Sequence, residues 1–219
     1  MDATKRAVWA LERLHAAYGI PRPDPSAPVE TLVLTILSQN TNDVNRDRAY
    51  ASLLERFGTL DAVRTAPVGR VSEAIRHGGL HRQKAERIVQ VLDRIVAERG
   101  RLDLSFLESM PLDDAMAWLL ASPGVGHKTA GIVMLFSFGR AYFPVDTHIR
   151  RVFTRVGLIG PRDDPHRRMN EILPADAALM SDLHLLTIRL GREVCHPKRP
   201  ECPVCPLRTG CDEARIDAV

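Results

Sequence analysis

Long apolar segments are absent from this chain of 219 residues. No apolar run approaches the roughly 18 residues that a membrane-spanning helix requires, so no membrane partner is expected. The first residues, MDATKRAVWALERL, form an amphipathic pattern and lack the apolar centre of a secretory signal. The hydrophobic content of 45% and the charged content of 26% are typical of a soluble globular protein. A cytoplasmic protein is therefore expected.

Cysteine is missing from the first 194 residues, which excludes a disulfide framework spread over the fold. The four cysteines follow in one segment with the spacing C-x6-C-x2-C-x5-C: Cys195, Cys202, Cys205 and Cys211. Four thiolates this close can converge on an iron–sulfur cluster or on zinc, and the spacing alone leaves that choice open. A bound metal would also fix the intervening Lys198 and Arg199, which could then hold a phosphate. The alternative is that these two charges are simply solvated.

Lysine is scarce, because the chain has 30 basic residues of which only Lys5, Lys84, Lys128 and Lys198 are lysines. Arginine stays charged at any working pH, whereas a lysine can lose its proton and act as a nucleophile. Lys128 lies in SPGVGHKTAG, residues 122–131, directly after a glycine-rich turn. The net charge of +3 permits a nucleic-acid partner without requiring one.

Strand patterns are missing too, since no alternating apolar and polar run is bounded by hairpin signals, and an all-α fold is predicted. Thr129–Phe138 is apolar on nearly every side, which predicts a buried central helix. Asp113 is expected to cap the helix that ends before Pro123. The chain is expected to change domain at the prolines before residue 29 and at Gly139–Pro144. Other helices are predicted to end at Gly19 and to span 29–38, 43–57, 71–76, 82–98, 147–156, 165–173 and 181–192, with a short one near Leu60.

The turn that contains Gly124 and Gly126 separates two predicted helices. Glycines at alternate positions let backbone N–H groups face outward toward a phosphate, although a tight interhelical turn without a ligand fits equally well. Asp146 follows an extended segment and precedes a predicted helix that begins at Thr147. It is interpreted either as the N-cap of that helix or as a carboxylate that balances charge near the Lys128 amine.

Five segments, in this order, resemble one known family: ILSQNTNDVNRD, GGLHRQKAERI, LASPGVGHKTAGIVM, PVDTHIRRVFTRVGLI and the cysteine segment. The resemblance is to endonuclease III, the helix-hairpin-helix DNA glycosylases with a [4Fe–4S] cluster, and it extends over essentially the whole chain. It implies two helical domains that flank a DNA-binding cleft. A six-helix barrel with the helix-hairpin-helix would span residues 28–139. An iron–sulfur domain would combine residues 1–27 and 140–219.

By this resemblance, Lys128 and Asp146 are catalytic and the four cysteines bind the [4Fe–4S] cluster. A damaged nucleotide would be flipped out of the duplex, Lys128 would form a Schiff base at C1′, and β-elimination would cut the strand. The implied activity is removal of oxidised pyrimidines by a bifunctional glycosylase and AP lyase. The implied partner is double-stranded DNA with a damaged base or an abasic site, bound by a nucleoid-associated monomer.

The resemblance also assigns DNA contacts, which fall on two loops and on the hairpin. The family commonly reads S-A-Q-A-T-D where this chain has Ser38–Asp43, so its duplex-inserting glutamine aligns with Asn40, beside Gln39. Two rival functions remain: a glycosylase that removes T or U opposite G, and a non-catalytic iron–sulfur helix-hairpin-helix module. The presence of both Lys128 and Asp146 argues against the second. The predicted DNA-binding residues are Gln39, Asn40, Leu80, His81, Gly124, Val125, Gly126, His127, Lys198 and Arg199.

Overall fold

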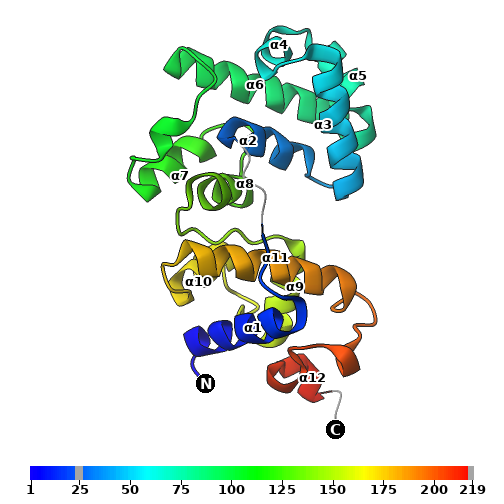
Figure 1. Cartoon of the computed structure of the whole chain (residues 1–219), viewed down its shortest axis with the longest axis vertical. Coiled ribbons are helices and arrows are strands. Elements are labelled where there is room, and N and C mark those ends of the chain that lie inside the picture. Colours follow the sequence, from blue (N-terminus) through cyan, green and yellow to red (C-terminus); the bar gives the residue numbers. More distant parts are fainter. Residues whose placement is uncertain (23–26, 217–219) are drawn as a thin grey trace. The chain divides into compact units, whose positions relative to one another are not determined.

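The computed structural model describes residues 1–22 and 27–216, with the side chains of Arg215 and Ile216 left aside. All regular structure in these ranges is helical, which confirms the all-α prediction (Figure 1). The α-helices are α1 (Ala3–Tyr18), α2 (Pro28–Leu37), α3 (Asp43–Phe57), α4 (Leu60–Thr65), α5 (Val68–Ala74), α6 (His81–Arg99), α7 (Leu112–Leu120), α8 (His127–Ile132), α9 (Thr147–Val156), α10 (Pro165–Ile172), α11 (Ala177–Glu193) and α12 (Asp212–Ile216). None of the helices in these ranges is both long and apolar enough to cross a membrane.

The contacts within the chain divide it into two compact units. The central unit is Pro25–Phe138 and contains α2 to α8. The terminal unit is formed by Met1–Asp24 together with Gly139–Val219, so that α1 packs with the helices of the C-terminal part. Each unit is described separately below.

Helix α2 forms the core of the central unit. Leu32, Val33, Ile36 and Leu37 are all fully buried, and α2 contacts α3, α6 and α8. Pro28 at the start of α2 suits the first helical turn, where its missing N–H costs no hydrogen bond. The C-terminal end of α2 is therefore held at the centre of this unit, and the loop that follows it starts from a fixed point.

Two local predictions in the central unit need correction. Helix α7 begins at Leu112 after Pro111, so Asp113 lies in its first turn and is not its cap. The predicted continuous helix Thr129–Phe138 is α8 followed by a π-helical turn at Val133–Ser137. Ser137 Oγ donates a hydrogen bond of 2.9 Å to Thr31 Oγ1 on α2, and such π-helical turns occur frequently at functional sites. The buried position of the segment itself is confirmed by Ala130, Val133 and Met134, among others.

The terminal unit is built on α9 and α11, which lie against each other. A Cβ added at Gly191 would come within 2.9 Å of His148 Cβ, so the glycine permits this close approach. Helix α1 packs on α11, and His15 Nε2 lies 2.8 Å from Asp182 Oδ2 across that contact. Gly157, with φ +82°, ends α9. Its missing side chain leaves room for the ion pair between Arg6 and Asp212, with a distance of 2.9 Å.

Candidate active site

Lys128 is the second residue of α8 and lies beside the end of α2. Its Nζ donates a hydrogen bond of 3.4 Å to Ser38 Oγ, and Ser38 Oγ donates to Thr35 O at 2.7 Å. The side chain is half-buried. Lys128 and the segment after Ser38 both carry predicted site residues, and the fold brings Lys128 to Ser38 although the two are 90 residues apart.

The two glycines of the hairpin before α8 differ, because the fold itself requires only Gly124. Gly124 has φ +78°, and a Cβ there would overlap the side chain of Arg87. Gly126 has φ −100°, a value that any residue adopts, and a Cβ there would meet nothing within 4 Å. Val125 is buried and its N–H donates to Ser122 O at 3.1 Å, so it fixes the turn from inside. Gly126 and His127 are the exposed residues at the hairpin tip.

The loop after α2 and the turn before α6 lie next to each other. Asn40 is exposed with φ +51°, and Leu80 is 51% exposed with φ +46°. A Cβ on Gly79 would be 3.8 Å from Asn40 O. Left-handed backbone is uncommon for residues other than glycine and is often found at functional sites, where the surroundings hold it in place. We call Ser38–Asn40 and Gly78–Leu80 the probing loops.

The other two residues predicted in the probing region have side-chain partners. Gln39 is half-buried and bonds to Arg87 and to the Gly124 carbonyl. His81, the first residue of α6, has its Nδ1 2.8 Å from Ser72 Oγ on α5. The ring of His81 is thereby held at the start of α6, and it remains half-buried.

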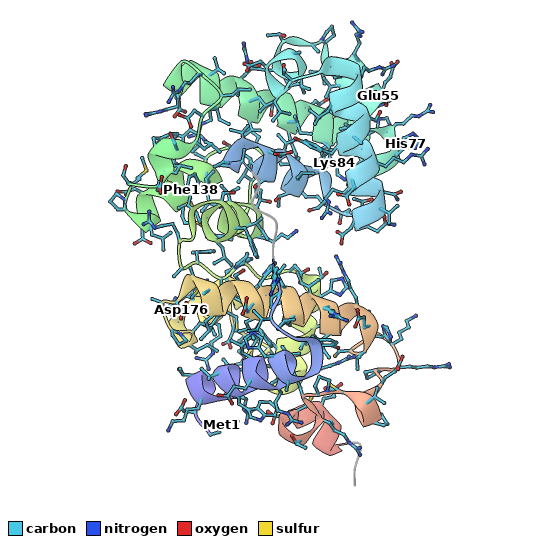
Figure 2. The ribbon with its side chains drawn as sticks, in the orientation of Figure 1. Met1, Glu55, His77, Lys84, Phe138 and Asp176 are labelled. Carbon is cyan, nitrogen blue, oxygen red and sulfur yellow. The ribbon has the colours of Figure 1, made fainter. Side chains whose placement is uncertain are left out.

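Lys84 was not identified from the sequence, yet it joins the two probing loops. Lys84 is labelled in Figure 2 and is only 1% exposed. Its Nζ donates hydrogen bonds of 2.7 Å both to Leu37 O and to Gly78 O. Burial lowers the pKa of Lys84 from 10.5 to about 8. A lysine on the apolar face of α6, among Ala85 and Ile88, was the signal in the sequence that could have revealed it.

Asp146, in the terminal unit, caps α9. Its Oδ1 accepts a hydrogen bond of 2.8 Å from the Ile149 N–H, which confirms the structural interpretation of this residue. Among residues 1–22 and 27–216, Oδ2 makes no hydrogen bond or ion pair that would occupy it. The carboxylate is half-buried, oriented by its own helix, and keeps one oxygen available for a ligand.

The four cysteines line one pocket of the terminal unit. Burial raises the pKa of the Cys205 thiol to about 11 and also raises that of Cys211, and in both cases the neighbouring thiols add to the shift. Within the described part of the chain, no three His, Cys, Asp or Glu side chains are grouped tightly enough to hold one metal ion.

Two arginines of α9 hold the cysteine loop. Arg155 donates to Cys195 Sγ at 3.3 Å and to His196 O at 2.7 Å, and Arg151 donates to Cys195 O at 2.9 Å. On the other side of the loop, Gly210 packs so closely on the ring of Trp9 that a Cβ would overlap it. The cysteine loop is thus attached to both α9 and α1.

The two basic residues within the cysteine loop are exposed. Neither Lys198 nor Arg199 makes a hydrogen bond or an ion pair with another residue that the structure describes. Arg199 has φ +58° and joins Asn40 and Leu80 as the third residue other than glycine with a positive φ in the described ranges. Their charges are therefore available to an external anion.

Comparison with known proteins identifies the class to which this fold belongs. The family model described as HhH-GPD superfamily base excision DNA repair protein matches residues 33–174, so the chain belongs to this superfamily. Endonuclease III of Thermotoga maritima is 33% identical over 189 residues, which cover 84% of this chain and 83% of that protein. Endonuclease III of Sulfolobus acidocaldarius is 35% identical over 83% of this chain and 80% of that protein.

The same likeness extends to solved structures. A trapped endonuclease III–DNA covalent intermediate matches with a TM-score of 0.82 and 26% identity over 100% of both chains. The resemblance to endonuclease III that the motifs predicted is thereby confirmed. Within the superfamily, this chain is a DNA glycosylase/AP lyase similar to endonuclease III.

Proposed function

We propose that this enzyme removes oxidised pyrimidines from duplex DNA and then cuts the strand through a Schiff base on Lys128. The observation that carries the proposal is the position of Lys128, a half-buried amine directly after the exposed hairpin tip. Of the other lysines, Lys84 is buried on two carbonyl oxygens, and Lys5 and Lys198 are exposed. Lys128 is thus the lysine placed next to the predicted phosphate contact, where its amine could act as a nucleophile.

In the proposed reaction, the neutral Nζ of Lys128 attacks C1′ of a flipped nucleotide while the bond to the damaged base breaks. The departing base takes up a proton. The C1′–O4′ bond then breaks and O4′ takes the remaining proton from the nitrogen, which opens the sugar ring and leaves a C1′ imine. Removal of a C2′ proton expels the 3′ phosphate and cuts the strand. Asp146 would stabilise the positive charge that develops on the sugar, through the oxygen that α9 does not use.

The hairpin supports a role in holding the DNA backbone. Gly124 is required by its own fold, whereas nothing in the protein requires glycine at Gly126. A missing side chain at an exposed turn is useful where another backbone must approach closely. We therefore assign Gly126 and the adjacent His127 to phosphate contact. On the terminal unit we assign the same role to Lys198 and Arg199.

The cysteine cavity supports a [4Fe–4S] cluster held by Cys195, Cys202, Cys205 and Cys211. Thiolates are the usual ligands of such clusters, and four thiols from one short loop line the same pocket. When bound, the cluster would cross-link the loop and fix Lys198 and Arg199. The enzyme is expected to act as a monomer on double-stranded DNA.

Borohydride trapping tests this proposal. Borohydride reduces an imine to a stable amine, so a covalent protein–DNA product reports the Schiff base directly. We expect trapping on duplexes with thymine glycol and with an abasic site, and little on a T·G mismatch. Preferential release of thymine from T·G would instead indicate a mismatch glycosylase. Absence of a trapped product on all three duplexes would contradict the proposed mechanism.

A further inference from the structure

The side-chain amide of Gln39 forms a bridge inside the central unit. Its Oε1 accepts a hydrogen bond of 2.9 Å from Arg87 Nη1, and its Nε2 donates one of 2.9 Å to Gly124 O. The bridge joins three segments that are remote in sequence: the first probing loop, α6 and the hairpin. Both ends of the amide are used, so the side chain is held in one orientation.

Arg87 fills the space between α6 and the hairpin. Its Cγ lies within 2.9 Å of the point that a Cβ on Gly124 would occupy, and its guanidinium reaches on to Gln39. A Gln39 side chain that swung into a duplex would break both amide bonds and leave Arg87 without this acceptor in a half-buried place. Losing such hydrogen bonds is unfavourable, since a buried polar group then has no partner.

Asn40 lies next to Gln39 and has none of these restraints. It is exposed, and its backbone has a left-handed conformation. Asparagine tolerates this backbone better than most residues. The two neighbours are thus distinct: one is tied into the protein and the other points outward.

We propose that Gln39 and Arg87 are positioning residues that set the distance between the hairpin and the probing Asn40. The inference rests on the proposed function, in which the hairpin holds a phosphate and Asn40 enters the duplex. The bridge fixes the distance between these two contacts. A DNA strand bound at Gly126 therefore meets Asn40 at a constant distance from the bound phosphate. Gln39 itself does not enter the DNA.

The test compares four variants of the full-length protein: Gln39→Met, Gln39→Glu, Arg87→Met and the double Gln39→Met/Arg87→Met. Glutamate keeps the shape and the acceptor for Arg87 but cannot donate to Gly124 O. Arg64→Met is the matched control, because Arg64 also links two helices of this unit, with 3.1 Å to Asp93, away from the loops. The readouts are single-turnover excision, base flipping followed by 2-aminopurine fluorescence, affinity for undamaged duplex and thermal unfolding.

Each single variant should lower excision and flipping about 10-fold, because small displacements of catalytic geometry have effects of this size or larger. The double variant should be no more than about twofold worse than either single one, since residues that share one interaction are not additive. Affinity for undamaged duplex should stay within about twofold, and thermal unfolding should match Arg64→Met. Asn40→Ala should lose flipping while the bridge is intact.

Independent, additive losses at Gln39 and Arg87 would overturn the inference. So would a loss confined to Gln39 variants, which would mean that Gln39 contacts the DNA itself. Weakened binding to undamaged duplex by Arg87→Met alone would identify Arg87 as a phosphate contact and would also contradict the bridge. A wild-type protein without excision or trapping would contradict the proposed function instead, so the two failures can be told apart.

Discussion

At the residue scale, two of the chain's few lysines, Lys84 and Lys128, have surroundings unlike those of a surface lysine. Lys84 fits a closed site with two carbonyl acceptors 2.7 Å away, whereas a planar guanidinium would be too large for it. Lys128 occupies a half-buried place beside Ser38. The scarcity of lysine was visible in the sequence and favoured Lys128 as a site residue. It could not show which lysine is buried and which can reach a ligand.

The first prediction separates the two proposed catalytic residues. Lys128→Arg retains charge and reach, so affinity for an abasic-site analogue should change by less than about 10-fold, or 1.4 kcal/mol. Borohydride trapping should disappear because no amine remains at C1′. Asp146→Asn keeps the amine, and it should retain some lyase activity on a preformed abasic site while base excision falls steeply. Trapping by Lys128→Arg would show that another amine is the nucleophile.

The second prediction concerns Lys84 and pH. Lys84→Met leaves two buried carbonyls without their donor and should lower the free energy of unfolding by about 2 kcal/mol at pH 7. Burial lowers the pKa of Lys84 to about 8, against 10.5 when unfolded, so between these values the unfolded chain binds more protons. The stability that Lys84 confers should therefore increase as pH rises from 8 toward 10, by at most about 1.4 kcal/mol per pH unit.

Denaturant unfolding of the wild type and Lys84→Met at pH 7, 8 and 9 measures this difference. Lys5→Met serves as the control, because Lys5 is exposed and pairs only with Asp2 at the surface. A constant difference between wild type and Lys84→Met over this pH range would mean that Lys84 keeps its ordinary pKa in the folded protein.

At the scale of elements, the hairpin allows a comparison between two neighbouring glycines. Gly124→Ala introduces a clash with Arg87 at a left-handed position, and it should destabilise the protein by about 2 kcal/mol. Gly126→Ala meets no atom of the protein, and it should change stability by less than about 0.5 kcal/mol. We expect it to weaken binding to damaged and undamaged duplex alike. Thermal unfolding and duplex titrations check both variants, and unchanged DNA affinity in Gly126→Ala would remove Gly126 from the phosphate site.

The helices themselves were largely predictable, because hydrophobic periodicity and the glycines and prolines that end helices are local signals. The two glycines before Leu80 are a local signal of the same kind, and Leu80 does lie on an exposed turn. The π-helical turn at Val133–Ser137 and the Gln39 bridge were not predictable in this way. Both depend on partners about 50 to 110 residues away in the sequence, such as Thr31 for Ser137 and Gly124 for Gln39.

At the scale of the whole molecule, α9 connects two predicted sites within the terminal unit. Asp146 caps its first turn, and Arg151 and Arg155 on its later turns hold the cysteine loop. A rearrangement of that loop would therefore act on the helix that orients Asp146. Lys128 belongs to the other unit and takes its position from Ser38 and the hairpin.

The cofactor prediction follows from this arrangement. Purified protein should be yellow-brown, with a broad absorption near ~400 nm and about four irons per chain. Cys202→Ser should lower iron content and soluble yield, and the residual soluble protein should lose base excision more than trapping on preformed abasic sites. Iron analysis and the two activity assays measure this. A colourless protein with one zinc per chain would contradict the assignment.

The left-handed backbone of Leu80 has a consequence for attempts to make this enzyme more heat-resistant. A leucine in this conformation costs roughly 1 kcal/mol relative to glycine, and half of its side chain is exposed, so Leu80→Gly should raise the melting temperature by a few degrees. Laboratory evolution for thermostability alone would select that change. If Leu80 fills the gap left by a flipped base, the Leu80→Gly protein would have a higher melting temperature and a lower excision rate. Leu80→Ala would lower the excision rate without raising the melting temperature. Melting curves and excision rates of the two variants would show whether the strain at this turn is retained for the sake of DNA recognition.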